Sequence, residues 1–213
     1  MKALSKKISH SIYDQVPYVV FTLALLVLIG WREHCYGLVA WSSKSHGWPP
    51  MAPWSAIGFA AWGWANLGKR TKVYEAYLGV FIAGFATLFL AENFTNIRFS
   101  TLDTFFDLSW TEFEFPHPGR LAIGTCIGFQ LAGLRSIHQD LRVRQSIGFL
   151  IAIIGSFTCL CFVFADPLGF YLSKWSNPMA LPSGVLFWLI GTYCMFEDPP
   201  VKSLDCKEAC RRG

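Results

Sequence analysis

The chain has 213 residues, of which 53% are hydrophobic, 16% are aromatic and only 15% are charged, with a formal net charge of +4. This composition is too apolar for an ordinary soluble domain of this size and indicates an integral membrane protein.

Six apolar segments follow one another along the chain. Windows of about 20 residues, the length that crosses about 30 Å of hydrocarbon, place them at 14–31, 51–68, 73–91, 121–137, 145–165 and 179–196. The first segment follows three lysines and could also be a signal-peptide core. We interpret it as an anchor because it is long and lacks a small-residue cleavage site. The sequence therefore predicts an all-α membrane domain of six helices over residues 1–196 and a short cytoplasmic tail over 197–213.

The lysines and arginines predict the orientation of these helices. With the N-terminus in the cytoplasm, 13 of the 18 Lys and Arg fall on the inner side, including Arg135, Arg142 and Arg144. Inner loops are enriched in Lys and Arg, so we expect both termini in the cytoplasm. The inner loops GKRTK and RSIHQDLRVR are short and predict antiparallel neighbouring helices. The longest outer connection, 92–120, carries the carboxylates Asp103, Asp107, Glu112 and Glu114.

A segment of 13 residues occurs three times, as MAPWSAIGFAAWG from Met51, LAIGTCIGFQLAG from Leu121 and MALPSGVLFWLIG from Met179. All three copies have Ala second, Ser or Thr fifth, Phe ninth and Gly thirteenth. The shared Phe and Gly residues are Phe59, Phe129, Phe187, Gly63, Gly133 and Gly191. Each copy enters the membrane from outside, so we predict three helical hairpins around a pseudo-threefold axis. The small residues favour close packing between helices.

The middle copy follows a Pro-Gly-Arg sequence, Pro118 to Arg120, and continues through Thr125, Phe129, Gly133 and Leu134. This pattern resembles the multi-pass sensor region that precedes many bacterial histidine kinases and diguanylate cyclases, over about residues 15–196. The resemblance implies a sensory module of the bacterial inner membrane. Such regions are normally followed by a PAS, kinase or cyclase module. None is present here, so we expect any output to pass to a separate protein.

Arg120 lies where a positive charge opposes the helix dipole, on the side where positive charge does not favour insertion. A snorkelling arginine at the lipid headgroups is one interpretation. The rigid turn Pro116–Gly119 favours another, in which Arg120 pairs with Glu112 or Glu114, and Arg120→Lys loses the bidentate contact. The candidate residues for binding a ligand or partner are Arg120, His117, Glu112, Glu114, Asp103 and Asp107.

The leading functional hypothesis is a stand-alone sensory or regulatory module that recognises a small or lipidic signal at the outer face. The alternative is a non-catalytic structural or assembly subunit of a larger membrane complex. Membrane lipids and membrane proteins are the expected partners, and no nucleic acid is expected.

Other chemistry finds little support in the sequence. No nucleophile–base pair, phosphate loop or zinc-protease spacing is present, so we expect no enzyme activity. The five histidines fall in loops or at helix ends and no lysine lies within a span, so no cofactor is expected. Cys206 and Cys210 are half of a structural zinc site or a weak acylation signal, and we interpret them as reduced thiols.

Overall fold

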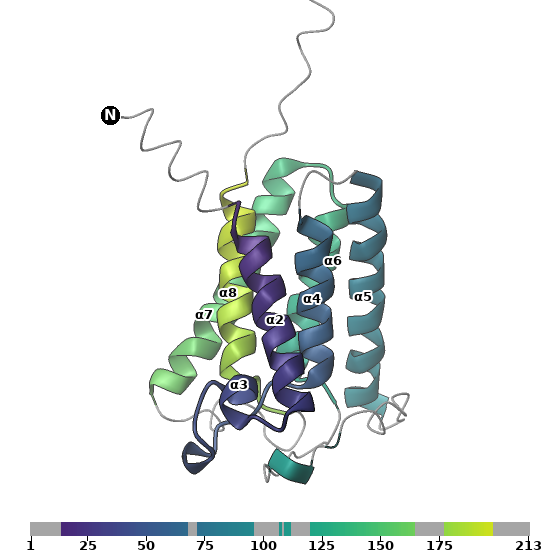
Figure 1. Cartoon of the computed structure of the whole chain (residues 1–213). Coiled ribbons are helices and arrows are strands. Elements are labelled where there is room, and N and C mark those ends of the chain that lie inside the picture. The colour runs from purple at the N-terminus through teal and green to yellow at the C-terminus, as the bar shows by residue number, and fades with distance from the viewer. Residues whose placement is uncertain are drawn as a thin grey trace, which may run out of the picture.

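Figure 1 shows a computed structural model of the chain, which describes residues 14–67, 72–95, 107, 109–111, 120–164 and 177–197. All regular structure in these ranges is helical, and the predicted all-α class is confirmed for them. The long helices are α2 (Val16–Arg32), α4 (Pro53–Asn66), α5 (Lys72–Thr95), α6 (Ile123–Ile137), α7 (Leu141–Val163) and α8 (Leu181–Met195). The short elements are α3 (Tyr36–Ala40) and the 3-10 turns η1 (Lys44–His46) and η3 (Ser109–Thr111).

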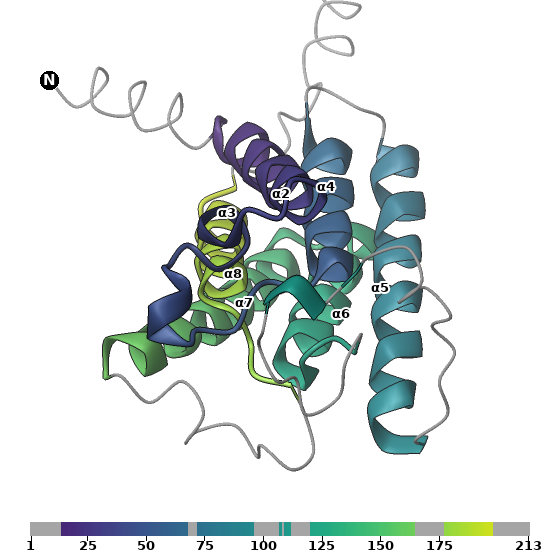
Figure 2. The same ribbon diagram turned by 60° about the horizontal axis from the view of Figure 1, so that its bottom comes forward.

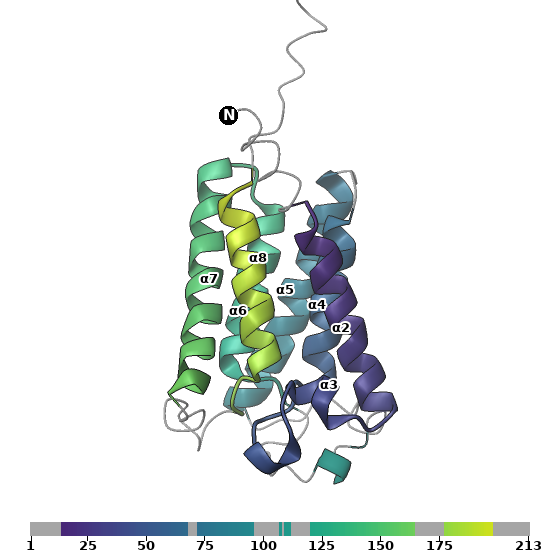
Figure 3. The same cartoon turned by 60° about the vertical axis from the view of Figure 1, so that its left-hand side comes forward.

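The long helices form one bundle in which α2 packs on α4, α5 on α6 and α7 on α8 (Figures 1 and 3). We call the end that carries α3, η1 and η3 the α3 end; it lies at the bottom of Figure 1 and faces forward in Figure 2. The opposite end, where α2 begins and α6 ends, is the Arg135 end. Helices α4, α6 and α8 all begin at the α3 end.

These three helices begin in the same way. Their N-cap residues Ala52, Ala122 and Ala180 have extended backbones, with ψ of 142°, 142° and 151°. Pro53 and Pro182 follow within the first two helical positions of α4 and α8. A proline there fits the first turn of a helix. Pro53 also drives Ala52, the residue directly before it, into an extended conformation. All three caps occupy the second position of the repeated segment.

The residue before each cap is buried and contacted by a side chain from the paired helix. Trp31 of α2 donates from Nε1 to the Met51 carbonyl at 2.8 Å. Asn93 of α5 donates from Nδ2 to the Leu121 carbonyl at 3.0 Å. The Thr158 hydroxyl of α7 lies 3.1 Å from the Met179 sulfur. In the first two cases a side chain supplies the hydrogen bond that a buried non-helical carbonyl requires.

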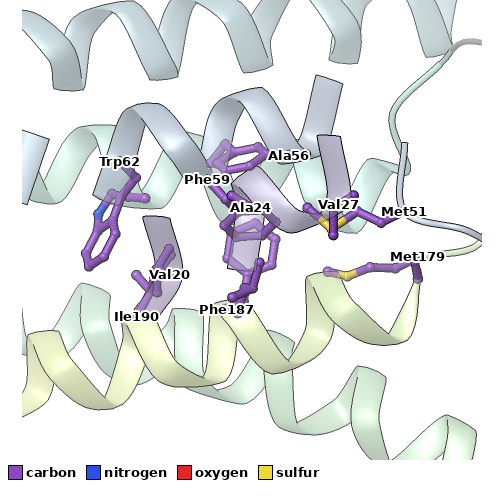
Figure 4. Packing of buried hydrophobic residues seen from close by; sticks show 14 of the residues in the cluster. Val20, Ala24, Val27, Met51, Ala56, Phe59, Trp62, Met179, Phe187 and Ile190 are labelled. Carbon is purple, nitrogen blue, oxygen red and sulfur yellow. The ribbon is translucent and has the colours of Figure 1, made fainter. Parts of the chain in front are cut away.

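The centre of the bundle contains the three phenylalanines of the repeated segment. The ring centroids of Phe59 and Phe129 are 4.7 Å apart, those of Phe59 and Phe187 4.7 Å, and those of Phe129 and Phe187 5.1 Å. All three side chains are fully buried. Figure 4 shows Phe59 and Phe187 among Val20, Ala24 and the other core residues. Helices α4, α6 and α8 therefore meet along the axis of the bundle.

The three glycines of the repeated segment lie against the helix paired with their own. A Cβ at Gly63 would lie 2.9 Å from the Phe21 nitrogen of α2, and one at Gly133 2.5 Å from the Gly79 oxygen of α5. A Cβ at Gly191 would lie 2.2 Å from the Ala152 nitrogen of α7. Since these neighbours are backbone atoms, only glycine permits this close approach.

Two helices are long and apolar enough to cross a membrane, namely α5 over Val73–Thr95 and α7. Each stretch is 23 residues long, and their most apolar windows have mean hydropathies of 1.7 and 2.3. Helices α2 and α8 are also apolar but shorter.

Candidate functional site

Four charged side chains from three helices and the residue after α8 meet at the Arg135 end. Arg135 lies in the last turn of α6 and Arg144 one turn into α7. Glu75 lies in the first turn of α5, and Glu197 follows the C-cap of α8. We call these four residues the charge network, and Arg135 and Arg144 the arginine pair. The helix dipoles favour Glu75 and Arg135 at their positions but disfavour Arg144, so Arg144 requires its carboxylate partners.

The hydrogen bonds connect all four members. Arg135 donates from Nη1 to Glu75 Oε1 at 3.1 Å and from Nη2 to Glu197 Oε2 at 2.8 Å. Arg144 donates from Nη2 to the same Glu75 oxygen at 3.0 Å and to Glu197 Oε1 at 2.7 Å. Both carboxylates therefore bridge both guanidinium groups.

A neutral residue brings the remaining helix pair into the network. Asn66, the last residue of α4, accepts from Arg135 Nη1 at 3.0 Å through its Oδ1. Tyr193 of α8 lies under the guanidinium, with its ring centroid 5.8 Å from Arg135 Cζ. Arg135 thus contacts side chains from all three helix pairs.

Burial makes the charge balance of this cluster important. The Arg135 side chain is 1% exposed and that of Arg144 10%, while those of Glu75 and Glu197 are 18% and 24% exposed. Two guanidinium groups face two carboxylates, so the charges balance. Charges withdrawn from water are tolerated when they are paired and hydrogen-bonded, and removal of one partner leaves an uncompensated charge.

A cavity of about 60 Å³ lies beside the network. Glu75 and Arg144 line one part of it. Ser136, near the end of α6, and His138 and Gln139 of the α6–α7 connection line another. That connection ends at Asp140, whose carboxylate accepts from the Arg142 backbone nitrogen at 2.8 Å and caps α7. The short loop thereby fixes the spacing between the two arginines.

The α3 end contains a second cluster of side chains. Lys44 donates from Nζ to the Trp110 carbonyl at 3.0 Å and lies 5.9 Å from the centroid of the Trp110 ring. That ring packs against those of Trp31, Tyr36 and His34, with centroids 5.1 to 6.5 Å away. Burial raises the pKa of Tyr36, whose hydroxyl donates to the Trp48 carbonyl. Trp110 therefore attaches η3 of the 92–120 connection to α2 and α3.

The site residues predicted from the sequence are only partly described. Arg120 is buried, and its backbone carbonyl accepts from Asn177 Nδ2 at 2.6 Å. Asp107 is exposed. The other predicted residues lie outside the described residues: Asp103, Glu112, Glu114, His117, Cys206 and Cys210. The pairing of Arg120 with Glu112 or Glu114 therefore stays a prediction. Among the described residues, no group of three His, Cys, Asp or Glu side chains could hold a metal ion.

Sequence reasoning missed the charge network. It treated Arg135 and Arg144 as cytoplasmic loop charges that orient the helices, and it gave Glu75 no role. A signal was present, because Glu75 is a lone carboxylate one turn inside an apolar segment and Arg135 lies within the last turn of another. A charge inside an apolar helix usually has a partner.

Comparison with known proteins gives no relative from which a function could be inferred. No family model matches the chain, and no curated protein or solved structure is significantly similar to it.

Proposed function

We propose that the chain is a multi-pass membrane module of the bacterial inner membrane, with α2, α4, α5, α6, α7 and α8 as its spans and both termini in the cytoplasm. The apolar residues of α5 and α7 support this, because only 22% and 39% of their most apolar windows are buried inside the protein. The exposed side chains on these helices include Phe81 at 57%, Leu88 at 56% and Leu160 at 52%. A surface this apolar requires a cover of lipid or protein.

Helices α4, α6 and α8 have only 14 or 15 residues each, fewer than a membrane span requires on its own. In the proposal, the extended residues before them complete the crossing. Met51, Leu121 and Met179 are at most 1% exposed. Non-helical backbone is tolerated at membrane depth when it is buried in protein.

The three helix pairs act in this proposal as three copies of one hairpin. The support comes from three positions of the repeated segment that have the same structural role in each copy. They are the alanine N-cap, the central phenylalanine and the glycine that lies against the paired helix. The pseudo-threefold arrangement also explains why a single residue, Arg135, contacts all three pairs at one end.

The function we propose is sensory or regulatory: a change at the α3 end alters how the hairpins pack and thereby moves the start of the C-terminal segment. One observation carries this proposal. Glu197, the residue after the C-cap of α8, accepts hydrogen bonds from both Arg135 and Arg144. Its position therefore depends on how α6 and α7 are placed. At the other end, Trp110 attaches the outer connection to the first hairpin.

Distance measurement between spin labels tests this coupling. Labels at Tyr77→Cys on α5 and Phe196→Cys after α8 replace exposed side chains, in a background whose native cysteines are replaced. Double electron–electron resonance should give a narrow distance distribution that broadens or shifts after Trp110→Ala at the far end. The matched control is Trp188→Ala, which removes an exposed tryptophan of α8.

An unchanged distribution after Trp110→Ala would refute the sensory proposal. It would favour the alternative, a rigid structural or assembly subunit, which co-purification of stoichiometric partners in mild detergent would support.

The orientation has its own test. A cysteine at Ser100, in the connection proposed to be outside, should react with an impermeant maleimide in intact cells. Reaction only after permeabilisation of the membrane contradicts the orientation.

A further inference from the structure

The arginine pair binds the carboxylate of Glu197 as two arginines bind an anionic ligand. Each guanidinium donates from Nη2 to a different oxygen, Arg135 to Oε2 at 2.8 Å and Arg144 to Oε1 at 2.7 Å. These are short, charge-assisted hydrogen bonds. Planar guanidinium groups in this arrangement suit a phosphate group as well as a carboxylate.

The two carboxylates of the network differ in how the chain holds them. Glu75 belongs to the first turn of α5, and a single oxygen, Oε1, accepts from both arginines. Glu197 lies beyond the C-cap Phe196, and both of its oxygens accept. Its backbone carbonyl accepts from Gln145 Nε2 at 3.3 Å. Glu197 is therefore the member that can leave without unwinding a helix.

Departure of Glu197 would leave the two guanidinium groups with Glu75 alone, a net charge of +1 around side chains that are 1% and 10% exposed. A buried charge without a partner is unfavourable. A singly charged anion would restore the balance, because it replaces Glu197 charge for charge.

The neighbouring cavity offers an approach to this position. It has a volume of about 60 Å³ and is lined by Arg144, Ser136, His138 and Gln139 as well as Glu75. His138 and Gln139 are exposed, and both side chains can donate hydrogen bonds. An incoming anion would therefore meet donors before it reached Arg144.

We propose that Arg135 and Arg144 form a binding site for a phosphate group, that Glu197 occupies this site in the present structure, and that phosphate and Glu197 compete for it. The phosphate group belongs either to a lipid headgroup or to a soluble phosphate. This inference deepens the proposed function and rests on it for its regulatory meaning: phosphate binding releases the start of the C-terminal segment.

Thermal unfolding of the purified full chain in an uncharged detergent tests the site. The variant is Glu197→Ala, and the probes are inorganic phosphate and phosphatidylglycerol in mixed micelles, each compared with chloride at the same ionic strength. We expect saturating probe to raise the Tm of Glu197→Ala by about 2–4 °C and to leave the wild type nearly unchanged. Glu33→Ala is the matched control, because Glu33 makes only an exposed pair with Arg32, 3.6 Å apart.

A second substitution locates the effect at the arginine pair. Adding Arg144→Gln to Glu197→Ala should abolish the rise. If Glu197→Ala does not fold, Glu197→Asp replaces it, since a carboxylate one methylene shorter is a weaker competitor and should also allow a rise.

The outcomes separate the alternatives. A rise with phosphatidylglycerol alone identifies a lipid headgroup, and a rise with inorganic phosphate alone identifies a soluble ligand. The inference is wrong if neither probe acts on the Glu197 variants, if Glu33→Ala or the wild type responds as strongly as Glu197→Ala, or if the rise survives Arg144→Gln. A phosphate response combined with unchanged spin-label distances after Trp110→Ala would refute the proposed function and leave the site standing.

Discussion

At the Arg135 end, four charged side chains contact one another across three helices and the residue after α8. At the α3 end the contacts are between aromatic rings and from single side-chain donors, such as Trp31 and Lys44, to backbone carbonyls. The contacts at the Arg135 end are mutual, because each carboxylate accepts hydrogen bonds from both arginines. The side-chain hydrogen bonds at the α3 end go to separate backbone carbonyls. The bundle therefore combines a cooperative Arg135 end with an α3 end whose backbone carbonyls each have a separate donor.

The two ends should differ in how much stability a single substitution removes. Removal of Trp31 or Asn93 would leave one backbone carbonyl without its side-chain donor, and a neutral hydrogen bond contributes about 0.5–1.5 kcal/mol. Removal of one arginine leaves the other facing two carboxylates in a largely buried place. The charge network should therefore be far more sensitive to single substitutions.

The largest effect is expected for Arg135→Met, which keeps much of the side-chain volume and removes the charge. Breaking a buried ion pair from one side costs about 3–5 kcal/mol, and Arg135 is the most buried member of the network, with its side chain 1% exposed. Reversible unfolding in mixed micelles measures the loss. Arg142→Met is the control, since Arg142 is an exposed arginine in the first turn of α7. Equal losses for the two variants would contradict the contrast between buried and surface charge.

A smaller loss is expected for Gly133→Leu, at the contact between α6 and α5. A Cβ there would lie 2.5 Å from the Gly79 oxygen and 2.8 Å from the Ala83 Cβ, so the helices must separate. Overpacking of this kind costs about 1–3 kcal/mol. Gly84→Leu on α5 is the matched control, because nothing lies within 4 Å of its Cβ position. Full stability of Gly133→Leu in the same unfolding assay would mean that the pairing of α5 with α6 is looser than described.

The helical elements could be predicted from the sequence because they depend on local patterns. Apolar runs located the six long helices, although α4 ends at Asn66 and α5 continues to Thr95, a few residues from the predicted limits. The sequence reasoning gave the repeated Phe residues no place, and they meet at the axis. The repeated Gly positions predicted close packing between helices, and the three glycines do lie against the paired helices. These inferences require only periodicity and residue size.

The charge network and the Trp110 contact could not be predicted in this way, because each depends on residues far apart in the chain. Glu75, Arg135 and Glu197 are brought together by the bundle as a whole. A count of charges per loop orients helices but contains no information about which charges meet. Arg120 has an unusual local sequence setting. The local setting of Arg135, a charge in the last turn of an apolar helix, indicates that it has a partner but not which residue the partner is.

The smallest effect is expected at the α3 end, for Lys44→Met. The Lys44 Nζ donates to the Trp110 carbonyl at 3.0 Å and lies 5.9 Å from the centroid of the Trp110 ring. Lys44 is an exposed residue, and exposed cation–π contacts contribute about 0.5–1 kcal/mol. Trp110 keeps its packing against Trp31 and Tyr36 in the variant, so the turn at 109–111 should stay attached. The same unfolding assay should therefore show a loss of at most about 1 kcal/mol, with Lys44→Arg close to the wild type. A loss as large as that of Arg135→Met would show that the α3 end is cooperative as well, and the distinction between the two ends would have to be abandoned.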